Sequence, residues 1–431
     1  MRKNNNFYLF FIFPALLLSA FPVFAFSSSG LHDYRVILHA HSQISGEDEY
    51  SLEDYAQFAK EKDVDVLLLT EYFQQKVTVR LVPPIPFLQW SHEKPSAVKY
   101  GVSRYFQATD EFNQTYPEVL AIPGAEVTPY YWWSGSLWSQ DWTVHDLQKN
   151  ILVAGLDAPS LQNLPTIENG NLTRNLGPKR EGAKPYQVLI DYVQAHQGIT
   201  IWSTPDEVFG SNFKIGPIYF KTPAYSQALL DTENYTGVGI FPDGTVETGR
   251  VGGIWDQLLY KYCRKRRSQP VWAFAEGVIH KKTFQENFGK WDNFVRATAR
   301  TPEAILDSIK RGSFYIRKIK HTDLRLNDFF ISDSASEKKS GMGETLICTG
   351  QPRIFVEIGL VTEKKSGDEV NVQVIRNGQV VYEDALSKTK PSFGWEDPNA
   401  FEDGPLIYYR VQGEVRTGGR VMSNPVFVEK V

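Results

Sequence analysis

The sequence contains few cysteines and no excess of positive charge. Of its 431 residues only Cys263 and Cys348 are cysteines, so we expect two free thiols and no disulfide framework. Lysine and arginine number 46 against 50 aspartate and glutamate residues, and this balance lacks the basic footprint of a nucleic-acid-binding protein. The hydrophobic share of 42% is that of a folded globular chain and excludes a largely disordered one.

A long apolar run stands at the N-terminus. Arg2 and Lys3 precede the apolar stretch 7–26, and Ala25 is the kind of small residue that precedes a signal-peptidase cut. The pattern predicts a signal peptide over residues 1–25 and an exported protein, periplasmic or secreted, with no membrane span after cleavage. The competing interpretation is an uncleaved N-terminal anchor, because the stretch is about as long as a membrane-spanning helix, although two prolines interrupt it.

Two histidines follow the first predicted strand of the folded part. The apolar run Tyr34–Leu38 predicts a strand, and His39 and His41 lie at its C-terminal end. Alternate residues of a strand face the same way, so both imidazoles should project together and could bind one metal ion. The alternative is that they only form hydrogen bonds within a polar pocket, for instance in a carbohydrate-binding protein.

Strand and helix patterns alternate over most of the chain. Ser51 with Asp54 three positions on predicts a capping box that begins a helix, and Val64–Thr70 is an apolar strand of the kind buried in parallel sheets. We expect Glu126 just past the end of a strand over 119–122. The repetition predicts a parallel α/β architecture, whose chemistry lies at the C-terminal ends of the strands. The polar residues with that placement are His39, His41, Glu71, Glu126 and His280.

The pattern changes near residue 321. Alternating apolar and polar residues over 353–358 and 372–375 predict strands, and Asn377-Gly378 between such runs is typical of a type I′ hairpin. No helical pattern of useful length follows Gly312. We therefore expect residues 321–431 to form a small antiparallel β-sandwich.

In this order the motifs resemble the PHP (polymerase and histidinol phosphatase) family, and within it the exported CehA/McbA-like branch with a C-terminal β-domain. The resemblance covers nearly the whole chain after the apolar stretch. It is carried by His39-Ala40-His41-Ser42, by 67–72 where a strand ending Thr-Asp-His is usual, by 122–126 with the bridging glutamate, by 201–205 in place of a His-Pro motif, and by 271–280 in place of a strand ending Asp-x-His.

The resemblance implies a distorted (β/α)7 barrel over residues 27–320, with two or three divalent metals at its strand ends for phosphoester or related hydrolysis. The sequence departs from the family pattern at several ligand positions. Tyr72 and Thr204 stand in place of histidines, Val278 stands in place of an aspartate, and Asn150 is in the region of a further histidine. Since valine cannot bind a metal, we expect at least one metal position to be lost.

The remaining residues imply a reduced site with one or two ions of zinc, manganese or iron. His39, His41 and Glu126 would form one His2Glu site, which suits zinc with an open position for water. A weaker second site would use His280, Glu71 and an acid of the first motif, for which Glu47 and Asp48 are both available. Glu71, Tyr72 or His280 would orient substrate or move protons.

Two functions follow from the resemblance. The first is a PHP-like metal-dependent hydrolase of the phosphoesterase type in the cell envelope, acting on a small-molecule or phosphoester substrate through the reduced site. The alternative is a catalytically inactive PHP-like pseudoenzyme, in which both domains persist as a binding or envelope-assembly module.

Overall fold

The fold is mixed α/β and has more strands than helices. A computed structural model describes residues 30–46, 49–74, 76–80, 89–135, 139, 141–166, 181–206, 212–216, 218–361 and 369–431. The predicted signal peptide and the predicted ligand Glu47, with its alternative Asp48, therefore lie outside the described residues. Both cysteines are free, as predicted, and both are buried.

The helices are short and all of those described begin before Gly312. They are α1 (Leu52–Glu61), α2 (Ala97–Tyr100), α3 (Val102–Thr115), α4 (Ala158–Gln162), α5 (Lys184–Ala195), α6 (Ser226–Asp231), α7 (Ile254–Cys263), α8 (Phe284–Asn287), which follows a 3-10 turn (Lys281–Thr283), and α9 (Pro302–Arg311). The predicted capping box is present, because Ser51 and Asp54 exchange side-chain and backbone hydrogen bonds at the start of α1. Gly312 ends α9 with a φ of 75°. In the described part of the chain, no helix is long and apolar enough to cross a membrane.

The largest sheet runs through both parts of the molecule. Its strands, in spatial order, are β20 (Thr345–Cys348), β27 (Val426–Lys430), β25 (Leu406–Val415), β26 (Arg420–Ser423), β17 (Phe314–Lys318), β16 (Trp291–Ala297), β1 (His32–Ala40), β2 (Val66–Leu69) and β6 (Leu120–Ile122), with β22 (Val370–Arg376) beside β25 and β23 (Gln379–Leu386) beside β22. Because β26 pairs with β17, the sheet passes from the C-terminal strands into the α/β part without a break.

A second sheet of six strands lies within the α/β part. Its order is β15 (Trp272–Ala275), β14 (Gly237–Phe241), β11 (Ile199–Trp202), β10 (Ile151–Ala154), β7 (Gly124–Val127) and β3 (Glu71–Tyr72). Most neighbours are parallel, but β10 runs antiparallel to both β7 and β11. This direction brings the start of β10 to the edge of the sheet where β7 and β11 end.

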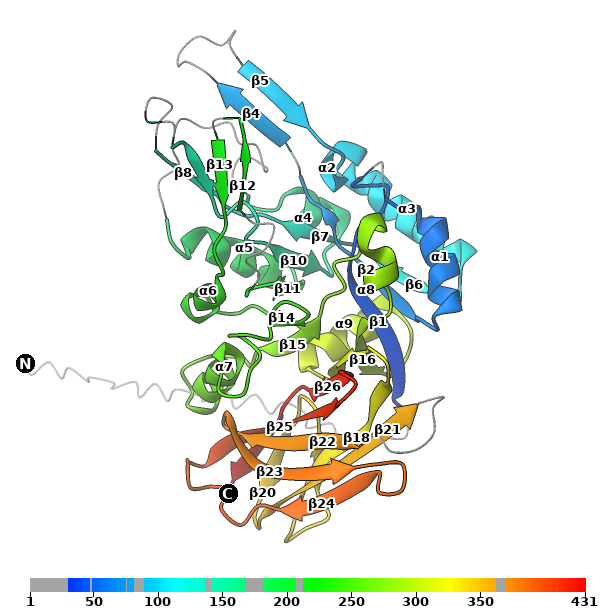
Figure 1. The fold of residues 1–431 in the computed structure, drawn as a ribbon, viewed down its shortest axis with the longest axis vertical. Helices are drawn as coiled ribbons and strands as arrows, with labels where there is room; N and C mark the ends of the chain where they lie inside the picture. The colour runs from blue at the N-terminus through cyan, green and yellow to red at the C-terminus, as the bar shows by residue number, and fades with distance from the viewer. Residues whose placement is uncertain are drawn as a thin grey trace, which may run out of the picture.

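Three smaller sheets complete the described strands. They are β12 (Asn212–Ile215), β13 (Ile218–Lys221), β9 (Thr143–His145) and β8 (Trp132–Ser134); β19 (Lys339–Gly341), β18 (Asp323–Asp333), β21 (Pro352–Val361) and β24 (Ser392–Glu396); and the hairpin β4 (Lys76–Arg80) with β5 (Gln89–Glu93). Figure 1 shows the β4–β5 hairpin projecting at one end of the molecule and the C-terminal strands at the other.

The expected barrel is not closed, and the sheets are not purely parallel. The described strands of the α/β part divide between the two large sheets, and β1 pairs with β16 in the antiparallel sense. A parallel neighbour needs a crossover, usually a helix, but the described part of the chain between β7 and β10 contains the strands β8 and β9 instead. The strand β10 therefore pairs antiparallel with β7 and β11, and the sequence pattern does not indicate this direction.

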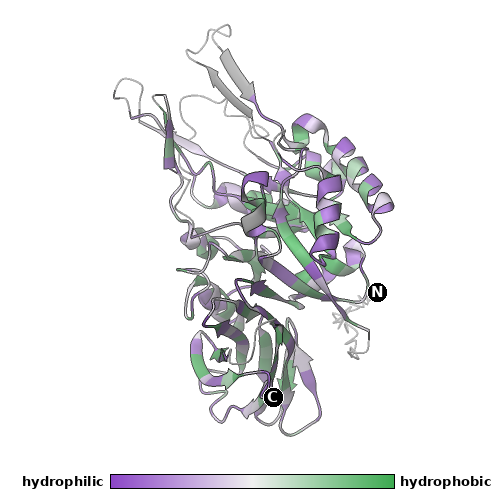
Figure 2. Cartoon of the chain, turned by 45° about the vertical axis from the view of Figure 1, so that its right-hand side comes forward, coloured by the Kyte–Doolittle hydropathy of each residue, from purple (hydrophilic) through white to green (hydrophobic). Residues whose placement is uncertain are grey.

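Two large hydrophobic cores stabilise the two parts, and a small third cluster forms around Tyr131 and Val144. The larger core collects the buried faces of the α/β strands and helices, and the second lies between β18 and β21 on one side and β22, β25 and β27 on the other. Figure 2 shows hydrophobic residues concentrated on the central strands. The predicted boundary at residues 320 and 321 falls in the bend between β17 and β18.

Candidate metal site

A distortion of β1 places the two histidines. The register of β1 against β2 shifts between Leu38 and Ala40, and His39 at the shift has a φ of 72°. The segment is held on its other side by the loop after β15, because His41 N donates to Ile279 O and Ile279 N donates to His39 O. The imidazole centroids lie 5.2 Å apart. The histidines therefore meet through a bulge held by two neighbours, not through simple strand alternation.

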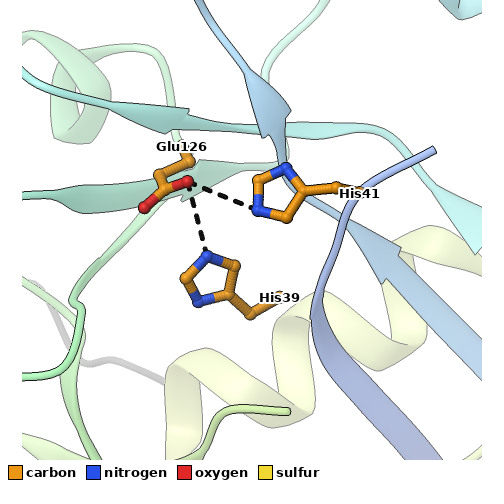
Figure 3. A group of neighbouring side chains, drawn as sticks. All are labelled: His39, His41 and Glu126. Atoms are coloured by element: carbon orange, nitrogen blue, oxygen red, sulfur yellow. Dashed lines mark ion pairs between the residues drawn. The ribbon is translucent and has the colours of Figure 1, made fainter. Parts of the chain in front are cut away.

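Glu126 reaches the same point from the second sheet. It lies within β7 and not just past a strand, because Gly124–Val127 forms a strand of its own after β6. Its Oε2 is 3.3 Å from His41 Nε2 and 3.5 Å from His39 Nε2. Figure 3 shows both imidazoles pointing toward the Glu126 carboxylate. One ligand atom from each residue lies within 4.8 Å of the others.

The spacing of these atoms fits a common cation. Ligand bonds of about 2 Å in a tetrahedral site separate ligand atoms by about 3.3 Å. The two nitrogen-to-oxygen distances above match that value. In addition, His39 Nε2 and both ring nitrogens of His41 are buried without a hydrogen-bond partner. Buried polar atoms are rarely left unpaired, so the residues present fit a divalent metal ion.

The three side chains also perturb each other's protonation. Burial lowers the pKa of His41 to about 4, against a smaller opposing effect of Glu126. Burial alone would lower the pKa of His39 as well, but the carboxylates of Glu126 and Glu276 outweigh it and raise the pKa to about 10. Burial opposes ionisation of Glu126, yet the two histidines hold its pKa well below the ordinary range. Glu126 is thus a carboxylate, the form that binds metals.

Asn150 occupies the second oxygen of Glu126. It directly precedes β10, and its Nδ2 donates to Glu126 Oε1, while Thr128 Oγ1 donates to Asn150 Oδ1 over 2.7 Å. The amide therefore holds the carboxylate with Oε2 toward the histidines. This hydrogen bond takes one lone pair of Oε1 and so competes with a second ion for that oxygen, which favours a single metal position.

Glu71 was predicted to act in catalysis or at a second metal. Its carboxylate accepts hydrogen bonds from the turn that follows His41. Both of its oxygens lie 3.0 Å from Ser42 N, and the hydroxyl groups of Ser42 and Ser45 also donate to them. Burial raises the pKa of Glu71, and these hydrogen bonds oppose that effect. In this arrangement Glu71 fixes the backbone that carries His41.

Tyr72 and His280 both stack against the His41 ring, and their own ring centroids lie 6.1 Å apart. The Tyr72 ring is stacked at 4.3 Å and the His280 ring at 4.5 Å from the His41 centroid. His280 Nδ1 is 3.1 Å from Glu49 Oε1, and burial raises the pKa of the Tyr72 hydroxyl. Within the described residues, His280 and Glu71 do not join the cluster that could hold a metal.

Two acidic residues of this region were not predicted. Glu276 follows β15 and its Oε2 is 3.1 Å from His39 Nδ1, and Glu49 pairs with His280. Neither matches a motif position, but Glu49 stands close to the acids considered for the first motif, and Glu276 is an acid just past a buried strand. The rule that placed Glu71 at a strand end could therefore have identified Glu276.

Comparison with known proteins yields little beyond this geometry. No protein-family model matches the sequence, and no curated protein matches it. A crystal structure of a two-domain protein from Bacteroides vulgatus, containing a predicted PHP-like metal-dependent phosphoesterase, is 12% identical with a TM-score of 0.40, over 90% of this chain and 92% of that one. An engineered protein is also 12% identical, with a TM-score of 0.15 over 24% of this chain and 21% of that one. At these TM-scores neither likeness supports an inference about this chain.

Proposed function

We propose that this chain is a PHP-like metal-dependent hydrolase of the phosphoester type, with one divalent ion held by His39, His41 and Glu126. The observation that carries the proposal is the His41 ring, whose two nitrogens are buried without a hydrogen-bond partner while Glu126 Oε2 lies 3.3 Å from Nε2. The resemblance of the motif order to the PHP family supports the choice of reaction. The predicted signal peptide supports a place of action outside the cytoplasm, in the periplasm or beyond.

A bound zinc, manganese or iron ion would polarise a scissile ester and lower the pKa of a water molecule. The side chains of the protein provide binding and orientation. Asn150 fixes the Glu126 carboxylate, Tyr72 and His280 fix the plane of the His41 ring, and Glu71 fixes the turn that follows it.

His280 is placed to move a proton during hydrolysis. Its side chain is 24% exposed, so it connects the buried cluster with solvent, and the Glu49 carboxylate lies 3.1 Å from its Nδ1. A histidine paired with a carboxylate can hold a proton on that nitrogen and pass it on, which is the general acid–base role of this side chain. Tyr72, which also stacks against His41, is placed to orient the substrate.

The proposal is tested by assaying hydrolysis of a generic phosphomonoester and phosphodiester with the metal-loaded protein and with chelator. We expect turnover only with metal, its loss in His41→Ala and Glu126→Gln, and a fall of about 100-fold or more in kcat for His280→Ala. The matched controls are His196→Ala at the end of α5 and Glu396→Gln in β24, which should keep full activity. A protein that binds metal but turns over no phosphoester or carboxyl ester would contradict the hydrolase proposal and favour the binding module.

A further inference from the structure

Glu276 is a second firmly held carboxylate beside the metal cluster. It is 1% exposed, its Oε2 is 3.1 Å from His39 Nδ1, and its Oε1 accepts a 3.1 Å hydrogen bond from Thr204 N. Its own backbone amide donates to Phe241 O over 2.7 Å. The three contacts come from three different strands or their ends, so the position of this carboxylate is determined from several sides.

The neighbouring strand leaves a space for this side chain. Gly239 in β14 has no side chain, and a Cβ at that position would lie 1.4 Å from Glu276 Oε1. The pairing of β14 with β15 is irregular between Gly239 and Phe241, directly opposite the carboxylate. Any residue larger than glycine would displace Glu276 from His39.

The backbone around Glu276 is strained. Thr204, whose amide donates to Glu276, has a φ of 41°, and Val278, two positions after Glu276, has a φ of 38°. They are the only β-branched residues with positive φ in the described part of the chain. Such conformations cost about 1–3 kcal/mol each and persist where the surroundings impose them, often at functional sites.

The contact with Glu276 shows that Nδ1 of His39 carries a proton. A carboxylate can only accept, so His39 Nδ1 must be the donor in its contact with Glu276. A metal ion bound at Nε2 would replace the proton on that nitrogen, which faces Glu126, and would leave the ring neutral with its remaining proton on Nδ1.

We propose that Glu276 is a positioning residue for the metal: it holds His39 with Nε2 directed at the cation and thereby sets the metal affinity of the site. This inference rests on the proposed function, since it assumes that His39 binds a metal. It adds a residue outside the ligand set, together with Gly239 as the position that makes room for it. Partners of this kind raise the basicity of a ligating imidazole and fix its orientation.

The test is a titration of the full-length protein with Co²⁺ and Zn²⁺, following the visible absorption of the cobalt form, for wild type, Glu276→Gln and Gly239→Ala. The glutamine side chain has one oxygen in place of two. In either orientation its NH2 group therefore faces a donor, which is Thr204 N in one orientation and His39 Nδ1 in the other. We expect metal affinity to fall about 10- to 100-fold in both variants, with a changed cobalt spectrum. Glu396→Gln and Gly394→Ala, whose added Cβ meets nothing within 4 Å, should bind like wild type.

The outcomes separate the two proposals. If wild type binds and both variants bind equally well with the same spectrum, the role of Glu276 is wrong while the metal site stands. If wild type binds neither metal, both proposals are wrong. If a variant does not fold, the ring ¹⁵N chemical shifts of His39 in the zinc form of the wild type decide: a proton on Nδ1 supports the inference, and an unprotonated Nδ1 overturns it.

Discussion

The molecule contains two kinds of buried charged cluster. At the junction of α7 and β25, Asp256 accepts hydrogen bonds of 2.7 Å from Arg410 Nε and Nη2, of 2.8 Å from Tyr408 OH and of 2.8 Å from Gly252 N. At the metal cluster, by contrast, both ring nitrogens of His41 and Nε2 of His39 have no hydrogen-bond partner. In the first cluster both carboxylate oxygens of Asp256 accept hydrogen bonds from the protein, whereas in the second three ring nitrogens form none.

This difference separates residues that hold the fold from residues that hold a ligand. An unpaired buried polar group costs about 1–3 kcal/mol, and a chain can remove that penalty by substitution unless the group has another use. Charge and burial alone do not make the distinction, since both clusters are buried and ionised. What distinguishes them is whether each polar atom has a partner.

The largest expected change in the free energy of unfolding comes from breaking the Asp256 cluster. Arg410→Ala leaves the Asp256 carboxylate buried without its counter-ion, so we expect a loss of about 3–5 kcal/mol in the free energy of unfolding. Urea denaturation measures this loss. Metal affinity of the folded variant should equal that of wild type. A loss below about 1 kcal/mol, the range of exposed ion pairs, would remove the distinction drawn above.

Metal should stabilise the wild-type protein through the metal cluster. At a free zinc concentration of 100 times Kd, binding to the folded state adds about 2.7 kcal/mol to the free energy of unfolding. His41→Ala should show no such gain, while His196→Ala, a histidine outside the cluster, should show all of it. Thermal unfolding with zinc and with chelator measures the effect. A melting temperature that chelator leaves unchanged in wild type would argue against a metal.

A smaller effect concerns acid stability in the C-terminal strands. Burial opposes ionisation of Asp333, but hydrogen bonds from Thr349, Ala335, Gly350 and Ser336 outweigh it and hold its pKa below the ordinary range. Its stabilisation is therefore fully present above the unfolded-state pKa of about 4 and is lost as the pH falls through the folded-state value. Asp333→Asn should lose about 1–3 kcal/mol at pH 7 and depend less on pH between about 5 and 2.

Urea denaturation of Asp333→Asn and wild type over this pH range checks the prediction. Parallel curves for the two proteins would contradict it. The metal affinity of the variant should not change, because Asp333 belongs to the C-terminal strands and not to the metal cluster.

Local signals in the sequence predicted local structure well. Ser51 and Asp54 form the predicted capping box, and Asn377 and Gly378 connect β22 and β23 with positive φ at both positions, as a type I′ turn requires. The meeting of His39, His41 and Glu126 was also expected from their places at strand ends. These features depend on neighbouring residues or on the resemblance of motifs.

The features that the sequence did not predict depend on long-range pairing. The antiparallel entry of β10, which brings Asn150 to Glu126, has no local signature in the sequence. The role of Gly239 is equally invisible, because it follows from the approach of Glu276 from another strand. Strand order and the contacts between distant side chains are determined by the packing of the core. A single sequence therefore indicates which residues form the site more readily than how they are arranged.

The central claim is that one divalent ion completes the cluster of His39, His41 and Glu126. The most direct measurement is the metal content of the purified protein by mass spectrometry, after expression in medium supplemented with zinc, manganese and iron. We predict about one equivalent per chain in wild type and almost none in His39→Ala or His41→Ala. Less than about a tenth of an equivalent in wild type would contradict the claim, because a site of this kind binds its metal tightly at neutral pH.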